Sequence, residues 1–293
     1  MKEREVCRDL PTRLLMKNNL ILILKGFVLG IANIIPGVSG GTLAITLGIY
    51  EKLIETISHF KDKIKENFKF LLFLVIGVAI ALLVFSNVVS FCLDKYPFAT
   101  ILFFIGIILG GVPKLFNKIK TEFKISNLVI GLITFAIVIA MTFLNTNDKV
   151  ISLETLNIFK IITLFFSGVI ASASMLLPGI SGSFVLMLIG YYKPIIDSIK
   201  DLTRFNNLGH NVVILLSMGL GIIVGIVCAA KLIEWLLKKY EIPTYYGIVG
   251  FVIASIISIF ISALSYSVGV VQVIVGILLL IVGIMISRII GDK

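Results

Sequence analysis

Long apolar runs separated by short basic segments dominate the chain. A helix needs about 20 residues to cross the roughly 30 Å hydrocarbon core of a bilayer. Six uninterrupted runs reach this length, at residues 70–93, 97–116, 125–144, 211–237, 244–264 and 268–287. The pattern therefore predicts an all-α integral membrane protein whose spanning helices are joined by short loops.

Two further apolar regions, 20–58 and 160–200, are each interrupted near the middle. The interruptions read Pro36-Gly37-Val38-Ser39-Gly40-Gly41-Thr42 and Pro178-Gly179-Ile180-Ser181-Gly182-Ser183. Proline and clustered glycine break a helix, and the arms on either side are short for a membrane span. We therefore predict two re-entrant hairpins that turn near mid-membrane, with second arms at 43–57 and 184–199.

The two interrupted regions are copies of one unit. A shift of 142 residues superimposes Gly26 on Gly168, Pro36 on Pro178, Ser39 on Ser181, Gly48 on Gly190 and Gly77 on Gly219, and a four-residue insertion then aligns Pro97 with Pro243. The chain is thus predicted to be an internal duplication. Residues 1–19 form a basic arm, and the repeats cover 20–150 and 151–293, each a hairpin followed by three transmembrane helices.

Loop charges predict how the repeats are oriented. Lysine and arginine concentrate in segments 1–19, 61–69 and 114–124, whereas 145–157 has Lys149 as its only basic residue. The positive-inside rule places the three basic segments, and both termini, in the cytoplasm. The first repeat then crosses an odd number of times, so the repeats are inverted; the loop after the second hairpin, which is basic but lies outside, fits the rule poorly. Inverted repeats with helices broken at mid-membrane are typical of secondary transporters.

Composition narrows the classes of function. The chain of 293 residues is 58% hydrophobic and 14% charged, against roughly 25% charged in soluble domains. Its net charge of +10 comes largely from loop lysines, which suits anionic lipid rather than nucleic acid. Three scattered cysteines indicate neither a disulfide framework nor a zinc site. Zinc-protease, nucleophile-elbow and Walker motifs are missing, so we expect a non-enzyme without a cofactor.

The two interruptions are the candidate binding site. A helix that starts at mid-membrane points N–H groups and about half a positive charge at the loop before it, and glycine lets an anion approach the backbone. The alternative is that each Pro-Gly-x-Ser-Gly run is only a tight turn, but two copies at matched positions favour an anion site. The candidate substrate-binding residues are Asn33, Gly37, Ser39, Gly40, Gly41, Thr42, Gly179, Ser181, Gly182 and Ser183.

Four charged residues are weaker candidates for phosphate contact or ion coupling. Lys25 and Lys160 lie on the first arms of the hairpins, where extension toward the membrane interface is the alternative role. Lys231 and Glu234, three residues apart, form either an interfacial pair or a proton-coupling pair. Because Lys25 interrupts the first apolar run and no cleavage site follows, we expect this segment to stay in the mature protein.

Glycines four residues apart predict close helix packing. They are the pairs Gly26–Gly30, Gly106–Gly110 and Gly221–Gly225. Trp235 is expected to anchor its helix at the membrane interface.

The run from Gly30 to Thr42, together with Leu177 to Ser183, resembles the bacterial polyprenyl-phosphate transporters of the PopT type, and the resemblance extends over nearly the whole chain. It implies a flippase that returns undecaprenyl phosphate, the lipid carrier of cell-wall precursors, from the outer to the inner leaflet of the plasma membrane. The second motif departs from the first, with Ser183 and Phe184 where Gly41 and Thr42 stand.

A lipid substrate agrees with the physical argument. The phosphate needs a polar recess to cross the hydrocarbon, while the prenyl tail can stay in lipid, so a lateral opening is sufficient and alternating access around the loops is expected. The partners are then the polyprenyl phosphate, membrane lipids and a coupling proton or sodium ion. The alternatives are an ion-coupled transporter of a small soluble anion and, from another class, a lipid-phosphate enzyme, which would need an acid–base pair that the sequence lacks.

Overall fold

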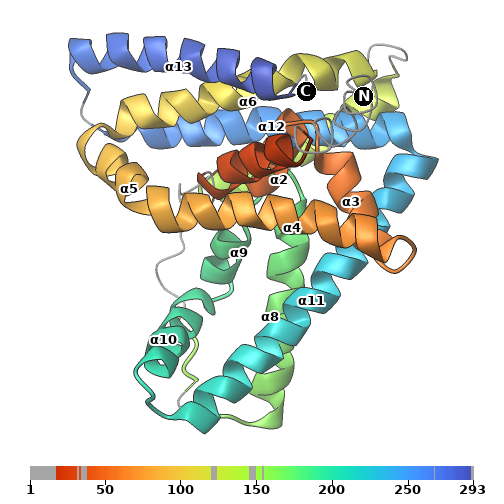
Figure 1. The fold of residues 1–293 in the computed structure, drawn as a ribbon, viewed down its shortest axis with the longest axis vertical. Coiled ribbons are helices and arrows are strands. Elements are labelled where there is room, and N and C mark those ends of the chain that lie inside the picture. The colour runs from red at the N-terminus through yellow and green to blue at the C-terminus, as the bar shows by residue number, and fades with distance from the viewer. Residues whose placement is uncertain are drawn as a thin grey trace, which may run out of the picture. The chain divides into compact units, whose positions relative to one another are not determined.

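The computed structural model describes residues 18–31, 33, 38–119, 124–144, 150–153, 155–266 and 268–291. All regular elements in these ranges are helices, as predicted. After a first helix at Asn18–Ile31, the elements are α2 (Gly40–Thr46), α3 (Tyr50–Ser58), α4 (Ile64–Ile80), a π-helical turn η1 (Ala81–Phe85), α5 (Ser86–Lys95), α6 (Pro97–Ile119), α7 (Ile125–Thr142), α8 (Ile158–Leu176), α9 (Gly182–Leu188), α10 (Tyr192–Thr203), α11 (Leu208–Lys239), α12 (Glu241–Leu264) and α13 (Val270–Gly291) (Figure 1).

The chain divides into two compact units. The first unit comprises Met1–Pro36, Leu43–Pro113 and Phe260–Lys293, and the second comprises Gly37–Thr42 and Lys114–Ile259. The first interruption, at residues 37–42, is therefore grouped with the second unit, although the chain on both sides of it belongs to the first.

Seven helices in the described ranges are long and apolar enough to cross a bilayer, so this is a multi-pass membrane protein. Six of them correspond to the six predicted spans, although α7 ends at Thr142 rather than at residue 144 and α13 begins at Val270 rather than at residue 268. The seventh is α8, which the sequence pattern assigned to the first arm of the second hairpin. It begins at Ile158, two residues before the predicted start, because Asn157 caps it: the Asn157 Oδ1 accepts a hydrogen bond of 2.8 Å from the Lys160 backbone N–H.

The segments predicted to be the second arms of hairpins are each broken into two helices, where single helices were predicted. Gly48 and Gly190 lie in the left-handed region, at φ of 68° and 82°, and separate α2 from α3 and α9 from α10. The same hydrogen bonds follow in each copy, with the Ile49 N–H bonded to the Ala44 carbonyl and the Tyr191 N–H to the Leu186 carbonyl. A left-handed glycine is the usual end of a helix, so the matched glycines mark a built-in bend.

One pattern of side-chain hydrogen bonds occurs twice, in a register different from the predicted one. Thr100 donates to the carbonyls of Cys92 (3.1 Å) and Tyr96 (2.8 Å). Thr244, which lies 144 residues later, donates to the carbonyls of Leu236 (3.2 Å) and Tyr240 (2.6 Å) in the same pattern. Beyond the hairpins the shift is therefore 144, so the equivalent of Gly77 is Gly221 rather than Gly219, and Pro97 corresponds to Glu241 rather than Pro243. The extra residues lie in α10, which has 12 residues where α3 has 9, while the turn that follows α10 is one residue shorter than the turn that follows α3.

A buried asparagine fixes the turn after each hairpin. The Asn67 side-chain amide donates to the carbonyls of His59 (2.9 Å) and Phe60 (3.3 Å). Asn211, again 144 residues later, donates to the Asn206 carbonyl at 3.0 Å. Both asparagines are almost fully buried, and each ties the preceding turn to its own helix through backbone carbonyls.

Replacing Asn67 with alanine should lower the free energy of unfolding by about 1–3 kcal/mol, because both hydrogen bonds of its side-chain amide are lost. The matched control is Asn87→Ala, since the Asn87 side chain is exposed on α5 and alanine is the better helix former. Thermal unfolding in detergent measures both. Equal melting temperatures for the two variants would contradict the role of Asn67.

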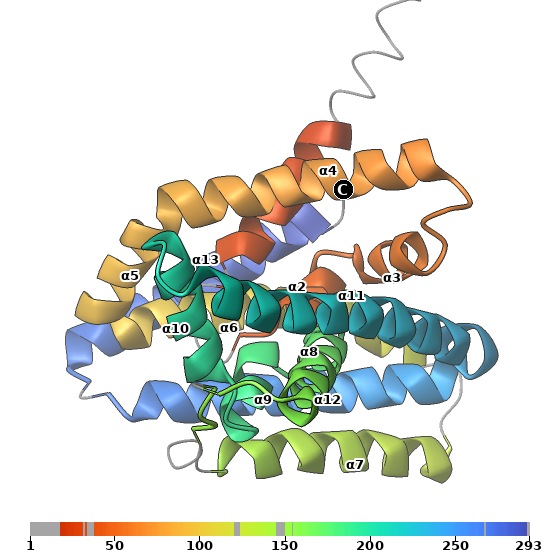
Figure 2. The same ribbon diagram turned by 90° about the horizontal axis from the view of Figure 1, so that it is seen from below.

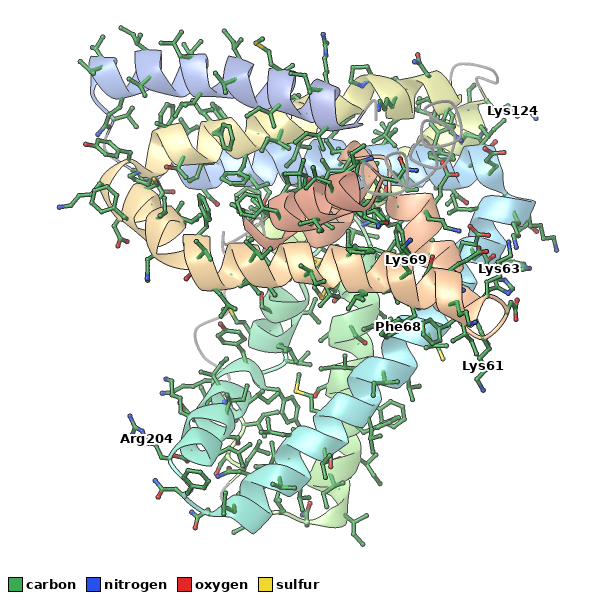
Figure 3. The ribbon with its side chains drawn as sticks, in the orientation of Figure 1. Lys61, Lys63, Phe68, Lys69, Lys124 and Arg204 are labelled. Atoms are coloured by element: carbon green, nitrogen blue, oxygen red, sulfur yellow. The ribbon has the colours of Figure 1, made fainter. Side chains whose placement is uncertain are left out.

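Basic side chains lie around the turn between α3 and α4. Figure 3 shows Lys61 and Lys63 before α4, with Phe68 and Lys69 on its first two turns. Phe68 is 56% exposed, and the Lys69 Nζ lies 6.0 Å from the centre of the Phe73 ring. Exposed lysine beside exposed aromatic rings is typical of the membrane interface.

Close contacts at glycine residues join the helix Asn18–Ile31 to α4 and, in the same way, α8 to α11. In the first unit, a Cβ added to Gly26 would overlap the Leu74 carbonyl. In the second unit, a Cβ added to Gly168 or Gly221 would overlap a backbone carbonyl of the facing helix, so α8 and α11 run side by side in contact (Figure 1). The close packing predicted for the glycine pairs is confirmed.

The last helix of each sequence half packs against a helix from the other half. In the first unit α13 contacts α6, where a Cβ on Gly110 would lie 2.6 Å from the Ser287 Cβ. In the second unit α7 lies along α12 (Figure 2), and Thr134 donates to the Gly247 carbonyl at 2.9 Å. Thr142 and Ser258 join the same two helices through a hydrogen bond of 2.9 Å between their hydroxyl groups. The compact units therefore do not follow the sequence halves.

Candidate functional site

The two interruptions are in direct contact within the second unit. The Ser39 hydroxyl donates to the Leu177 carbonyl at 3.3 Å. The Gly179 backbone N–H donates to the Thr42 hydroxyl at 2.7 Å. The segments 38–42 and 177–183, called here the first and second motif segments, are thus joined by two hydrogen bonds.

The first motif segment is buried in this contact. Ser39 is 2% exposed and Thr42 is fully buried. A Cβ at Gly41 would lie 3.1–3.2 Å from backbone atoms of Leu176 and Leu177, closer than most side chains pack. Glycine at position 41 therefore lets the two segments approach each other.

The second motif segment begins where α8 ends. Leu177 is extended, with ψ of 130°, and the following Pro178 is fully buried and cannot continue the helix. Gly179 has φ of 80°, and a Cβ on it would lie 2.6 Å from the Phe251 carbonyl oxygen of α12. Glycine is required at position 179 both by the positive φ and by the close approach to α12.

Apolar side chains anchor the second motif segment on either side of its serines. Ile180 and Val185 are buried in one cluster with Val138 of α7 and Ala254 of α12. Between these anchors, the Ser181 and Ser183 hydroxyl oxygens lie 2.8 Å apart. Ser183 is exposed and Ser181 is half-buried, so this hydroxyl pair is accessible where the hydroxyls of the first segment are not.

Several predicted site residues lie in helices rather than loops. Gly40, Gly41 and Thr42 form the first turn of α2, and Gly182 and Ser183 begin α9. Each of these helices has only seven residues, so its dipole is smaller than that of the longer second arm that was predicted. Asn33 is exposed, and Gly37 lies outside the described residues.

Comparison with known proteins decides the family. The sequence model of the VCA0040-like family, described as undecaprenyl phosphate translocase-like, matches residues 29–272. The chain belongs to this family. A polyprenyl-phosphate transporter of Staphylococcus aureus is 35% identical over 245 residues, covering 82% of this chain and 86% of the relative. One from Vibrio cholerae is 31% identical over 253 residues, covering 82% and 77%. No solved structure matches the chain.

Both motif segments lie inside the region that matches the translocase-like family.

The two lysines on the predicted first arms, Lys25 and Lys160, lie in different surroundings. Lys25 is only 6% exposed, and a buried cation in an apolar helix marks a functional candidate. Lys160 stays at the start of α8, where its Nζ donates to the Thr155 carbonyl at 2.8 Å.

The predicted pair of Lys231 and Glu234 is wrong. Glu234 is buried and pairs with Lys238, one turn further on, at 2.7 Å, while Lys231 is exposed. Nearby, the Lys239 Nζ lies 5.2 Å from the Trp235 ring centre. A carboxylate held by a lysine beside a half-exposed tryptophan fits the predicted interfacial anchor.

Sequence reasoning missed the backbone groups of the site. On either side of Pro178, the Leu177 carbonyl accepts from the Ser39 hydroxyl and the Gly179 N–H donates to the Thr42 hydroxyl. The only sequence signal for this is the replacement of Gly41 and Thr42 by Ser183 and Phe184 in the second copy. Among the described residues no group of three or more histidine, cysteine, aspartate or glutamate side chains could hold a metal ion.

Proposed function

We propose that this protein carries a polyprenyl phosphate across the membrane, returning undecaprenyl phosphate from the outer to the inner leaflet of the bacterial plasma membrane. The observation that carries the proposal is the contact between two broken helices in a membrane protein, with an accessible hydroxyl pair beside it. The relatives in Staphylococcus aureus and Vibrio cholerae, both polyprenyl-phosphate transporters by name, support the lipid substrate.

The phosphate would be received by the Ser181 and Ser183 hydroxyls. A hydroxyl that donates to an ionised oxygen makes a stronger hydrogen bond than one between neutral groups, and two donors side by side can bind two oxygens of one phosphate. Glycine at 179 and 182 keeps the backbone near them free of side chains. The prenyl tail can remain among lipid chains, because only the charged head requires a polar path.

Alternating access between inverted repeats would move the head group. The shared hydrogen-bond pattern of Thr100 and Thr244 supports two equivalent repeats, and the loop charges support cytoplasmic termini and opposite orientations. We assign the two hairpins as re-entrant for the same reason. Lys25, buried on the predicted first hairpin, is the strongest candidate for coupling transport to a proton or sodium gradient.

Reconstitution tests the proposal directly. Purified protein in vesicles should move a labelled polyprenyl phosphate between leaflets, with a rate that responds to an imposed proton or sodium gradient. Replacing both Ser181 and Ser183 by alanine should lower the rate at least tenfold, because each hydrogen bond to a charged group contributes about 1.5–3 kcal/mol.

Ser217→Ala is the matched control, since the Ser217 hydroxyl bonds back to the Val213 carbonyl of its own helix and should be dispensable. Excess inorganic phosphate is the second control. Strong competition by it, without movement of the lipid, would favour a soluble anion as substrate. Movement at the full rate by the folded double variant would remove the hydroxyl pair from the mechanism.

A further inference from the structure

We infer that the two motif segments have unequal roles: the first is a clamp that positions the second, and only the second presents hydroxyls to the substrate. This inference rests on the proposed function, because it divides the residues of that site into two classes. Thr42 and Ser39 become positioning residues, and Ser181 and Ser183 become the substrate-contacting residues.

The direction of the hydrogen bonds carries the first step. The Ser39 hydroxyl donates to the carbonyl before Pro178, and the Thr42 hydroxyl accepts from the N–H after it. Pro178 has no N–H of its own, and the Leu177 carbonyl and the Gly179 N–H lie on either side of it; the Leu177 carbonyl also accepts from the Ile180 N–H at 3.5 Å. The first segment therefore satisfies the polar groups that the break leaves exposed, and at membrane depth such groups need a protein partner.

Burial gives the second step. Ser39 is 2% exposed and Thr42 is fully buried, so neither hydroxyl can reach a phosphate while the clamp is closed. The Ser183 hydroxyl is exposed and bonds only to its neighbour Ser181 among the hydrogen bonds of this segment. The hydroxyls of the first segment are thus inaccessible, whereas those of the second can be reached.

The sequence differences between the copies agree with this division. Phe184 stands at the position equivalent to Thr42, so the second segment has no hydroxyl that could return the clamp bond. Ser183 stands at the position equivalent to Gly41, where a side chain would press on the Leu176 and Leu177 backbone. The serine is common to both copies, whereas Thr42 occurs only in the first segment and the second hydroxyl, Ser183, only in the second.

Position in the chain links the clamp to the hydroxyl pair. Gly179 is held by Thr42, and Ser181 follows it by two residues, before the first turn of α9. Releasing Gly179 frees the segment that sets where both serine hydroxyls point. Loss of the clamp should therefore weaken substrate binding through Ser181 and Ser183 rather than by removing a contact of its own.

A double-mutant cycle tests this inference, with a short-chain polyprenyl phosphate as the probe and its Kd as the readout. Thr42→Val removes the hydroxyl at nearly constant volume and should raise the Kd about tenfold, the effect of one lost hydrogen bond of roughly 1.4 kcal/mol. Thr42→Ser keeps the hydroxyl and should restore binding. In the background of Ser181→Ala with Ser183→Ala, Thr42→Val should have almost no further effect, because residues that act through one another are non-additive.

Three outcomes would overturn the inference. Equal effects of Thr42→Val with and without the serines would mean that Thr42 contacts the substrate itself. An unchanged Kd with a lowered melting temperature would reduce Thr42 to a folding role. An unchanged Kd at the wild-type melting temperature would mean that the clamp bond is dispensable. If Thr42→Val does not fold, Ser39→Ala, which removes only the longer bond of 3.3 Å, takes its place in the cycle. Failure of the wild-type protein to bind the probe would instead contradict the proposed function.

Discussion

Gly221→Ala should unfold the second unit at a markedly lower temperature than the wild type. The added Cβ would overlap the Phe165 carbonyl of α8, and backbone on both sides cannot yield without separating the two helices. Overpacking of this kind costs about 2–3 kcal/mol, which corresponds to a fall of roughly 5–10 °C in melting temperature for a domain of this size. Thermal unfolding of the purified protein in detergent measures it.

Gly219→Ala is a matched control two residues away on the same helix. A Cβ at Gly219 meets nothing within 4 Å, and alanine is favoured over glycine inside a helix by about 1 kcal/mol. The control should therefore be neutral or slightly stabilising. A larger loss for Gly219→Ala than for Gly221→Ala would restore the 142-residue register and contradict the one seen in the hydrogen bonds.

Gly179→Ala should abolish transport and also lower stability. The substitution places a side chain at φ of 80°, which costs about 1–2 kcal/mol, and its Cβ would lie 2.6 Å from the Phe251 carbonyl oxygen. Relief of that contact would move the second motif segment away from α12 and pull the Gly179 N–H from the Thr42 hydroxyl. Lipid movement in vesicles and the melting temperature are both measured.

Gly48→Ala separates backbone strain from steric conflict. Gly48 also has a positive φ, of 68°, but its Cβ would make only an ordinary contact of 3.6 Å. It should lower the melting temperature by a few degrees and leave most of the transport rate. Similar transport in the two variants would show that the approach of Gly179 to α12 is unimportant.

The sequence pattern predicted the class of fold and the breaks, because hydrophobic length and proline–glycine clusters act locally. It did not predict the register beyond the hairpins. Gly219 and Gly221 are both available on α11, and only packing against α8 decides which of them faces a helix. The 142-residue shift aligns Gly48 with Gly190, which was a sequence sign of the two bends. Glycine is common in helical patterns, however, so only the positive φ of these two residues identifies them as helix ends.

The sequence predicted which two segments form the candidate site, but not which of their hydroxyls are buried. Proximity of the two motif segments followed from the duplication, whereas the burial of Ser39 and Thr42 depends on which hydroxyl finds a backbone partner across the contact. The same limit applies to Glu234, since Lys231 and Lys238 lie three and four residues away on one helix and spacing alone does not choose between them.

The exchange of last helices between the sequence halves has a consequence for biogenesis. As the chain leaves the ribosome, α6 enters the membrane long before α13 is made, and until then Gly106 and Gly110 present a bare groove to lipid. Likewise α7 must wait for α12, some hundred residues later in synthesis. The second unit can be completed once α12 is made, whereas α6 of the first unit lacks its partner until α13 is synthesised. A nascent chain that stalls before the 22 residues of α13 therefore leaves an incomplete first unit for quality-control proteases to recognise.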